Sequence, residues 1–160
     1  MKNRLSENAK VVQGLAPITP STSTPDYISV RNAGHLSIII SVDNGDTVTG
    51  SAITLLQATV VAGTDEKALG FTTMYANTDT GASDTLVETT VASDTFTTDT
   101  TNAKNLLYVI EVDPASLDCD NNFDCIRVGT ANAANTVLDV VYVLTDLRYH
   151  GAGMPTAITD

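Results

Sequence analysis

Short segments that alternate apolar and polar residues, or that are continuously apolar, recur from Tyr27 to Arg148 and are separated by Gly, Asn, Asp and Pro. Alternation with a period of two between turn-forming residues is typical of β-strands. Many such segments at short, regular intervals indicate a sandwich or barrel. No stretch shows a convincing helical period, so parallel α/β folds with cofactor crevices are not expected.

The composition supports the same fold class. The chain of 160 residues contains 25 Thr together with many Val and Ile, whereas the helix formers Lys, Arg, Glu, Gln and Met are scarce. Residues branched at Cβ fit a pleated surface and favour strands. We therefore expect an antiparallel β-sandwich or jelly roll of about eight strands, forming a single domain over residues 26–160. The predicted strands cover residues 27–30, 36–43, 54–61, 71–76, 86–91, 105–113, 126–130 and 137–148.

Turns and core residues can also be predicted. Asn44-Gly45 is the strongest hairpin signal, since both central positions of a type I′ turn need a positive φ. Pro114 indicates a turn or a single 3₁₀ turn through residues 115–117, and residues 62–67 should form a loop. The apolar pattern predicts a buried set consisting of Ile38, Ile40, Leu55, Val109, Val128, Val141 and Val143.

Residues 1–25 differ from the rest. They hold three basic residues against the single acid Glu7, and prolines at 17, 20 and 25 remove backbone donors. Because the whole chain has a formal charge of −11, this segment carries +2 and the remainder −13. We expect an extended N-terminal arm over residues 1–25 whose residues 2–20 cross a neighbouring subunit instead of joining their own core. Its predicted contact residues are Lys2, Arg4, Leu5, Lys10, Val11, Val12 and Leu15.

The acidic charge restricts the partners. Nucleic acids and anionic membranes are recognised by Lys and Arg, which are too few here. The sequence contains no run of about 18 apolar residues, which a helix needs to span a bilayer. The start of the chain lacks the apolar segment of a signal peptide, so synthesis and retention in a host cytoplasm are expected. We expect neither a nucleic acid nor a membrane as partner.

The two cysteines, Cys119 and Cys125, cannot supply a four-ligand zinc site. They are either two free thiols or, if the segment between them forms a tight hairpin, a disulfide. The alternating acids of the same segment superficially suggest a calcium loop. However, Phe123 stands where an EF-hand needs Gly, and Gly129 where it needs a bidentate acid. An acidic surface turn without a metal is the preferred interpretation.

Catalytic signals are absent from the sequence. Only His35 and His150 titrate near neutral pH. Each lies at the end of a predicted strand, where a bond to backbone is a simpler explanation than catalysis. No nucleophile elbow, zinc-protease motif or phosphate-binding loop is present. We therefore expect no catalytic residue, no metal site and no cofactor.

Four motifs follow one another in the chain. They are Val-Arg-Asn-Ala-Gly-His-Leu at 30–36, Tyr-Val-Ile-Glu-Val-Asp at 108–113, Phe-Asp-Cys-Ile-Arg-Val at 123–128 and Leu-Arg-Tyr at 147–149. In this order the chain resembles the head decoration, or cement, proteins of tailed bacteriophages over most of residues 5–150. The resemblance implies a β-sandwich subunit on the outer face of the capsid that ties neighbouring capsomers together.

We therefore expect a non-enzymatic virion protein on the outer surface of the head. Its partners would be the major capsid protein and other copies of itself, as a dimer or trimer. The alternative is a tail or fibre module that binds a host receptor or carbohydrate. Loops rich in Thr, Asn and Asp suit sugar hydroxyls, but the chain has no Trp, 5 Tyr and 3 Phe, so few aromatic platforms exist. An enzyme is a third, weaker possibility.

Overall fold

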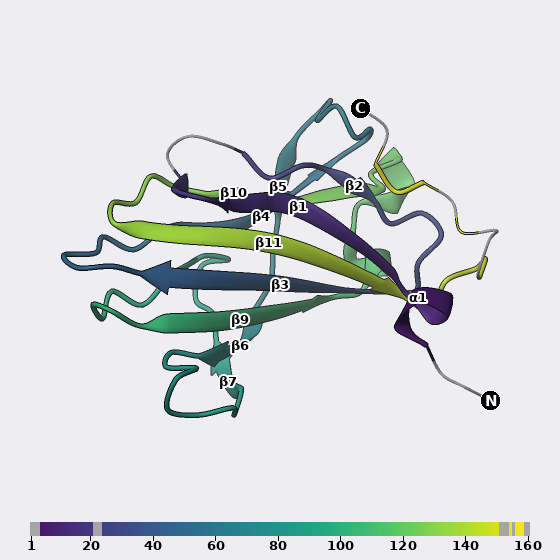
Figure 1. The fold of residues 1–160 in the computed structure, drawn as a ribbon. Helices are drawn as coiled ribbons and strands as arrows, with labels where there is room; N and C mark the ends of the chain where they lie inside the picture. The colour runs from purple at the N-terminus through teal and green to yellow at the C-terminus, as the bar shows by residue number, and fades with distance from the viewer. Residues whose placement is uncertain (1–3, 21–23, 151–153, 155, 159–160) are drawn as a thin grey trace.

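The computed structural model describes residues 4–20, 24–150, 154 and 156–158. In this part of the chain two antiparallel sheets pack against each other (Figure 1), which confirms the predicted all-β sandwich. The six-stranded sheet has the order β1 (Lys10–Ile18), β11 (Thr136–Thr145), β3 (His35–Asn44), β9 (Asn105–Val112), β6 (Thr73–Asn77) and β7 (Val87–Thr90). The five-stranded sheet has the order β2 (Ile28–Ser29), β10 (Cys125–Thr130), β4 (Ala52–Ala58) and β5 (Lys67–Leu69), with β8 (Phe96–Thr97) also paired to β4.

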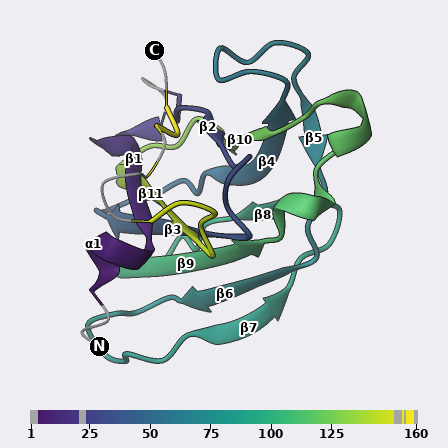
Figure 2. The same cartoon turned by 90° about the vertical axis from the view of Figure 1, so that its right-hand side faces the viewer.

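The helical elements that lie wholly within the described residues are single turns: α1 (Leu5–Asn8), and the 3₁₀ turns η2 (Pro114–Ser116) and η3 (Cys119–Asn121). The turn η2 confirms the prediction made from Pro114. Figure 2 shows α1 at one end of the sandwich, beside the start of β1. None of the helices among the described residues could cross a bilayer.

The core lies between the sheets and is built from alternate strand residues. In β3, for example, Leu36, Ile38, Ile40 and Val42 are buried, while the residues between them point to the other face. Of the seven predicted core residues, Ile38, Ile40, Leu55 and Val128 are at most 1% exposed, as predicted.

The prediction is wrong for the other three. Val109, Val141 and Val143 are partly exposed, and their neighbours Tyr108, Ile110, Val140, Tyr142 and Leu144 fill the core instead. In β9 and β11 both faces carry apolar residues, so periodicity alone did not identify the inner face. A shift of one residue exchanges the two faces of a strand.

The extended arm is also wrong for residues 10–18. They form β1, which pairs with β11 of the same chain from Lys10↔Leu144 to Ile18↔Leu138. Leu15 is only 6% exposed and belongs to the core of its own sandwich. Proline does not prevent this, because Pro17 lies in an edge strand whose register shifts twice, where a missing N–H is tolerated.

Several boundaries differ from the prediction. The short strands β5 and β8 were not predicted, and β5 begins within the expected loop at residues 62–67. Asn44-Gly45 forms no type I′ turn: β3 and β4 lie in different sheets, and neither residue has a positive φ. Asn44 is instead buried, and its side-chain amide nitrogen Nδ2 donates to the carbonyls of Asp99 and Thr101 at 2.8 and 3.1 Å. It therefore anchors a crossing between the two sheets.

One buried side chain joins the two sheets directly. Tyr142 on β11 is fully buried, and its hydroxyl accepts a hydrogen bond from the Val128 amide on β10 at 3.0 Å. The same hydroxyl donates to the carbonyl of Asp26 at 3.2 Å. Gly14 on β1 packs against the ring so closely that a Cβ there would lie 2.1 Å from Cε2.

The register can be tested with two adjacent isoleucines. Replacing Ile40, which is fully buried, by Ala should lower the free energy of unfolding by about 2–4 kcal/mol, because it leaves a cavity in the core. Replacing Ile39, on the other face of β3, by Ala should cost about 1 kcal/mol or less. Urea denaturation of both variants measures the difference. Equal losses would show that the register is wrong.

The link made by Tyr142 can be tested by removing its hydroxyl. Tyr142→Phe leaves the Val128 amide and the Asp26 carbonyl without this partner, and should cost about 1–3 kcal/mol. The matched control is Tyr149→Phe, at a position that is 50% exposed, and should change little. Denaturation midpoints of the two variants provide the comparison, and an unaltered midpoint in Tyr142→Phe would contradict the assignment.

Candidate interaction surface

The outer face of the six-stranded sheet, directed away from the core, carries an apolar row. The row consists of Val141, Ile39, Val109 and Tyr75, which face one another across β11, β3, β9 and β6. All four are partly exposed. Gln13 on β1 and Glu88 on β7 continue the row at its two ends. In Figure 1 no described helix or strand crosses this face. The sheet therefore exposes an apolar centre with polar ends.

A hollow lies on the same face where β3 ends and β11 begins. We call it the distal hollow; it is lined by Pro17, Ser41, Val42, Asp43, Thr80, Asn105, Leu106, Leu107, Val137 and Asp139. Its outward residues include the apolar Val137 and Leu107 and the two carboxylates Asp43 and Asp139. Neither carboxylate forms a salt bridge with a described residue. The distal hollow is thus both apolar and acidic.

A second hollow lies at the opposite end of the sheet, around the N-terminal turn, which we define as residues 4–9. Four of the predicted arm residues line it, namely Arg4, Leu5, Lys10 and Val11, together with Ser6, Ala9 and Met154. Leu5 is 63% exposed and Val11 49% exposed. Of the remaining arm residues, Val12 packs against the core, Leu15 is buried, and Lys2 lies outside the described residues.

The outer face of the smaller sheet is different because the loop before β5 is bonded to it through Glu66. Tyr27 packs there with Ala58 and Cys125. Its hydroxyl donates to Glu66 Oε2 at 2.6 Å, and Arg127 donates to the same oxygen through Nη2 at 2.7 Å. The hydrogen bond from Tyr27 and the contact with Arg127 hold the pKa of Glu66 below its ordinary value, although burial opposes them. Burial, followed by the bond to Glu66, raises the pKa of Tyr27 to about 12.

His35, Ser37 and Glu111 form a cluster on the outer face of the larger sheet. His35 Nε2 lies 2.7 Å from Glu111 Oε2, and the Ser37 hydroxyl donates to the same oxygen at 2.6 Å. His35 is therefore bonded to a side chain, not to backbone as predicted. A nucleophilic triad needs the hydroxyl bonded to the imidazole and the carboxylate behind it. Here the carboxylate takes both donors, so the serine has no base.

The cysteines are free thiols, Cys119 exposed and Cys125 buried, so the disulfide alternative is wrong for this structure. The segment between them begins in η3, whose C-cap Asn122 lies in the left-handed region at φ 63°. The segment is therefore not a tight hairpin. Asp118 at its start forms an ion pair with Lys67 and accepts from the Asn121 amide. No group of three potential metal ligands occurs among the described residues.

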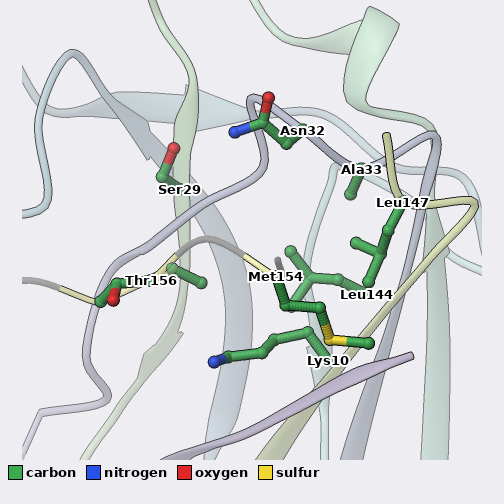
Figure 3. Close-up of a pocket in the computed structure, with 9 residues that line it drawn as sticks. Lys10, Ser29, Asn32, Ala33, Leu144, Leu147, Met154 and Thr156 are labelled. Atoms are coloured by element: carbon green, nitrogen blue, oxygen red, sulfur yellow. The ribbon is translucent and has the colours of Figure 1, made fainter. Parts of the chain in front are cut away.

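Near the C-terminus, Met154 and Ile158 pack against the core. The amide of Ser29 donates to the carbonyl of Ala157 at 2.8 Å. In Figure 3 the side chain of Met154 lies beside Leu144 and Lys10. The cavity that these residues enclose has a volume of about 20 Å³, which suits a water molecule and not an organic ligand. It is therefore no candidate for a substrate site.

Comparison with known proteins gives little further information. No family model and no curated protein matches the chain. A solved structure similar to it is that of the SPBc2 prophage-derived protein YomS, with 11% sequence identity and a TM-score of 0.49, covering 87% of this chain and 94% of that chain. At this identity and TM-score the likeness carries no conclusion about the function of the present chain.

The network around Glu66 predicts a pH dependence of stability. A carboxyl group whose pKa is lowered by folding stabilises the fold above its unfolded pKa, and this contribution is lost as the pH falls through the folded pKa. Glu66→Gln should therefore destabilise the protein at neutral pH and flatten the loss of stability below about pH 4.5. The slope should not vanish, because the pKa values of Asp79 and Asp118 are also lowered, mainly by hydrogen bonds from Lys104 and Lys67.

Denaturation midpoints of Glu66→Gln and wild type, measured from neutral to acidic pH, test this prediction. Glu88→Gln on the exposed strand β7 is the matched control. Parallel pH profiles for Glu66→Gln and wild type would show that the carboxylate has no stabilising role.

Proposed function

We propose that this protein is a non-enzymatic structural protein of a phage virion, a decoration protein that binds the outer surface of the head through its six-stranded sheet. The observation that carries the proposal is the partly exposed apolar row of Val141, Ile39, Val109 and Tyr75. A sheet face in contact with water normally carries polar residues. A contiguous apolar row across four strands is a feature of surfaces that bind another protein.

The polar surroundings of the row support a protein partner. The row on one side of it holds Ser37 and Glu111 with Val143, and the row on the other holds Ser41 and Asp139 with Leu107, so polar residues are mixed into both flanking rows. A protein–protein interface likewise has an apolar core and more polar surroundings. With about 4.8 Å between strands and about 3.3 Å per residue, six strands of 4 to 10 residues give a face of about 700 Å². That is close to one partner's share, about 800 Å², of a standard interface of about 1,600 Å².

A shell suits such a surface because it offers many copies of the same contact. Each bound subunit that bridges neighbours must be released before a capsomer can leave, which stabilises the closed shell. Multivalent attachment also allows each contact to be weak. The acidic remainder of the chain is compatible with a surface that faces water, and unsuited to contact with a packaged genome.

The assignment to a phage head rests on the order of the sequence motifs. In the structure these motifs form the turn before β3, the strand β9, the start of β10 and the segment after β11. They supply core residues such as Tyr108 and Ile126. The motifs therefore support the β-sandwich architecture that the resemblance to decoration proteins implies, and the apolar row supports the binding role.

Three substitutions on the outer face test the proposal. Ile39→Thr, Val109→Thr and Val141→Thr combined keep branched residues that favour strands, but make the row polar. The variant should keep its β-sheet circular dichroism signal and bind shells stripped of this protein at least about tenfold more weakly in co-sedimentation. The matched control, Val60→Thr with Val87→Thr, changes two other exposed valines and should bind normally. Unchanged binding by the triple variant would exclude the face.

The structural role is tested by adding the protein back to stripped shells. Decorated shells should release DNA at a higher temperature than stripped shells, equally well with EDTA and a reducing agent present, because no metal or disulfide is needed. A requirement for calcium or for oxidised cysteines would assign a function to the turn at Asp118–Cys125. Equal stability of stripped and decorated shells would reject the decoration role. A glycan-binding screen would then test the host-binding alternative.

A further inference from the structure

The N-terminal turn displays a basic and an apolar side chain on an ordered support. The Arg4 side chain is 62% exposed and Leu5 is 63% exposed. The Ala9 amide donates to the Leu5 carbonyl at 2.8 Å, and the Asn8 amide side chain donates to the Arg4 carbonyl at 3.0 Å. Glu7 lies 3.6 Å from Arg4, but an exposed pair of this kind is weak and leaves the guanidinium available.

The distal hollow has the complementary chemistry. Val137 is 38% exposed, and with Leu107 and Pro17 it provides an apolar floor for a leucine side chain. Asp43 and Asp139 line the same hollow and can accept hydrogen bonds from a guanidinium. The nearby Lys104, whose carbonyl accepts from the Asn44 amide, does not neutralise them, because its ammonium is paired with Asp79.

The turn and the hollow of one molecule cannot meet. The turn precedes β1, whose first residue Lys10 pairs with Leu144, next to the start of β3. Asp43 is near the other end of β3, eight residues beyond His35 and therefore about 26 Å along the strand. Figure 1 shows α1 at one end of the sheet and the end of β3 at the other. If an N-terminal turn occupies the hollow, it must therefore come from a second molecule.

We infer that copies of this protein associate head to tail, with Leu5 and Arg4 of one copy bound in the distal hollow of the next, between Asp43 and Asp139. This names the contact between copies within the proposed structural role. A chain of net charge −11 repels its own copies, so a contact that brings unlike charges together is favoured. The contact uses two different surfaces, so it produces rings if the rotation closes and open chains if it does not.

Two defective variants test the inference without any shell. Leu5→Asp removes the apolar contact of the turn and leaves the hollow unchanged. Asp43→Lys with Asp139→Lys reverses the charge of the hollow and leaves the turn unchanged. In analytical ultracentrifugation the wild type should form oligomers that weaken with added salt. Each variant alone should associate at least about tenfold more weakly. An equimolar mixture should form a one-to-one dimer and nothing larger, because only one productive contact remains.

Matched controls separate this contact from general effects. Val60→Asp adds the same charge at another exposed apolar position, and Asp120→Lys reverses an acid on η3; both should associate like the wild type. A wild type that stays monomeric at its highest soluble concentration would overturn the inference. So would variants that associate normally, or a mixture that stays monomeric. The Leu5→Asp variant and the Asp43→Lys, Asp139→Lys variant both keep the apolar row intact. The triple threonine variant changes only that row, so its binding to shells tests the proposed function separately from the contact between copies.

Discussion

The two sheets depend on the hydroxyl of Tyr142 for a contact that backbone pairing cannot supply. β2 pairs with β10 only at Cys125 and Ile126, so beyond this point the edge of β10 has no neighbouring strand. The Tyr142 hydroxyl accepts the Val128 amide at that place. Burial raises the pKa of Tyr142, so the hydroxyl keeps its proton and can donate to Asp26. The ring also explains Gly14, where any Cβ would overlap it and displace β1.

The outer faces of the two packed sheets differ in what lies on them. On the smaller sheet, Glu66 binds both Tyr27 and Arg127 and ties a loop to the face. On the larger sheet no comparable side chain reaches across from a loop of the described residues, and the apolar row stays uncovered. The guanidinium of Arg127 also lies 5.2 Å from the ring of Tyr27, which further stabilises the network on the smaller sheet. The proposed binding surface is thus the face to which no loop is tied by a network like that of Glu66 in the described residues.

The alternation of apolar and polar residues was sufficient to predict the fold class. It also identified the inner face of a strand where only one of its two faces is apolar. In β3 the polar Ser37 and Ser41 mark the outer face, so Ile38 and Ile40 were correctly placed in the core. In β11 the outer face carries the polar Asp139 but also Val137, Val141 and Val143, so one acid did not mark that face clearly and the wrong face was chosen. The continuous apolar run was nevertheless a signal that both faces are apolar, which is the property that defines the candidate surface.

Longer-range contacts could not be predicted from local patterns. The prolines and the basic charge suggested an extended arm, because the sequence does not show that β11 offers an edge on which a bulged strand can pair. The turn signal at Asn44-Gly45 was overridden by the buried amide bonds of Asn44 to Asp99 and Thr101, which are 55 and 57 residues away. Likewise, the spacing of the cysteines did not show that Cys125 begins a buried strand and Cys119 an exposed turn.

The edges of the larger sheet also determine how copies of the protein can meet. Along β1 the register shifts twice, Pro17 has no N–H, and the Asp26 amide already occupies the Gly14 carbonyl. At the opposite edge, β7 has only four residues and includes the charged Glu88. Interrupted, short and charged edges disfavour the addition of further strands. Contacts between molecules are therefore left to side chains on the outer face and at the two ends of the sheet, where shape and charge restrict both the partner and its orientation.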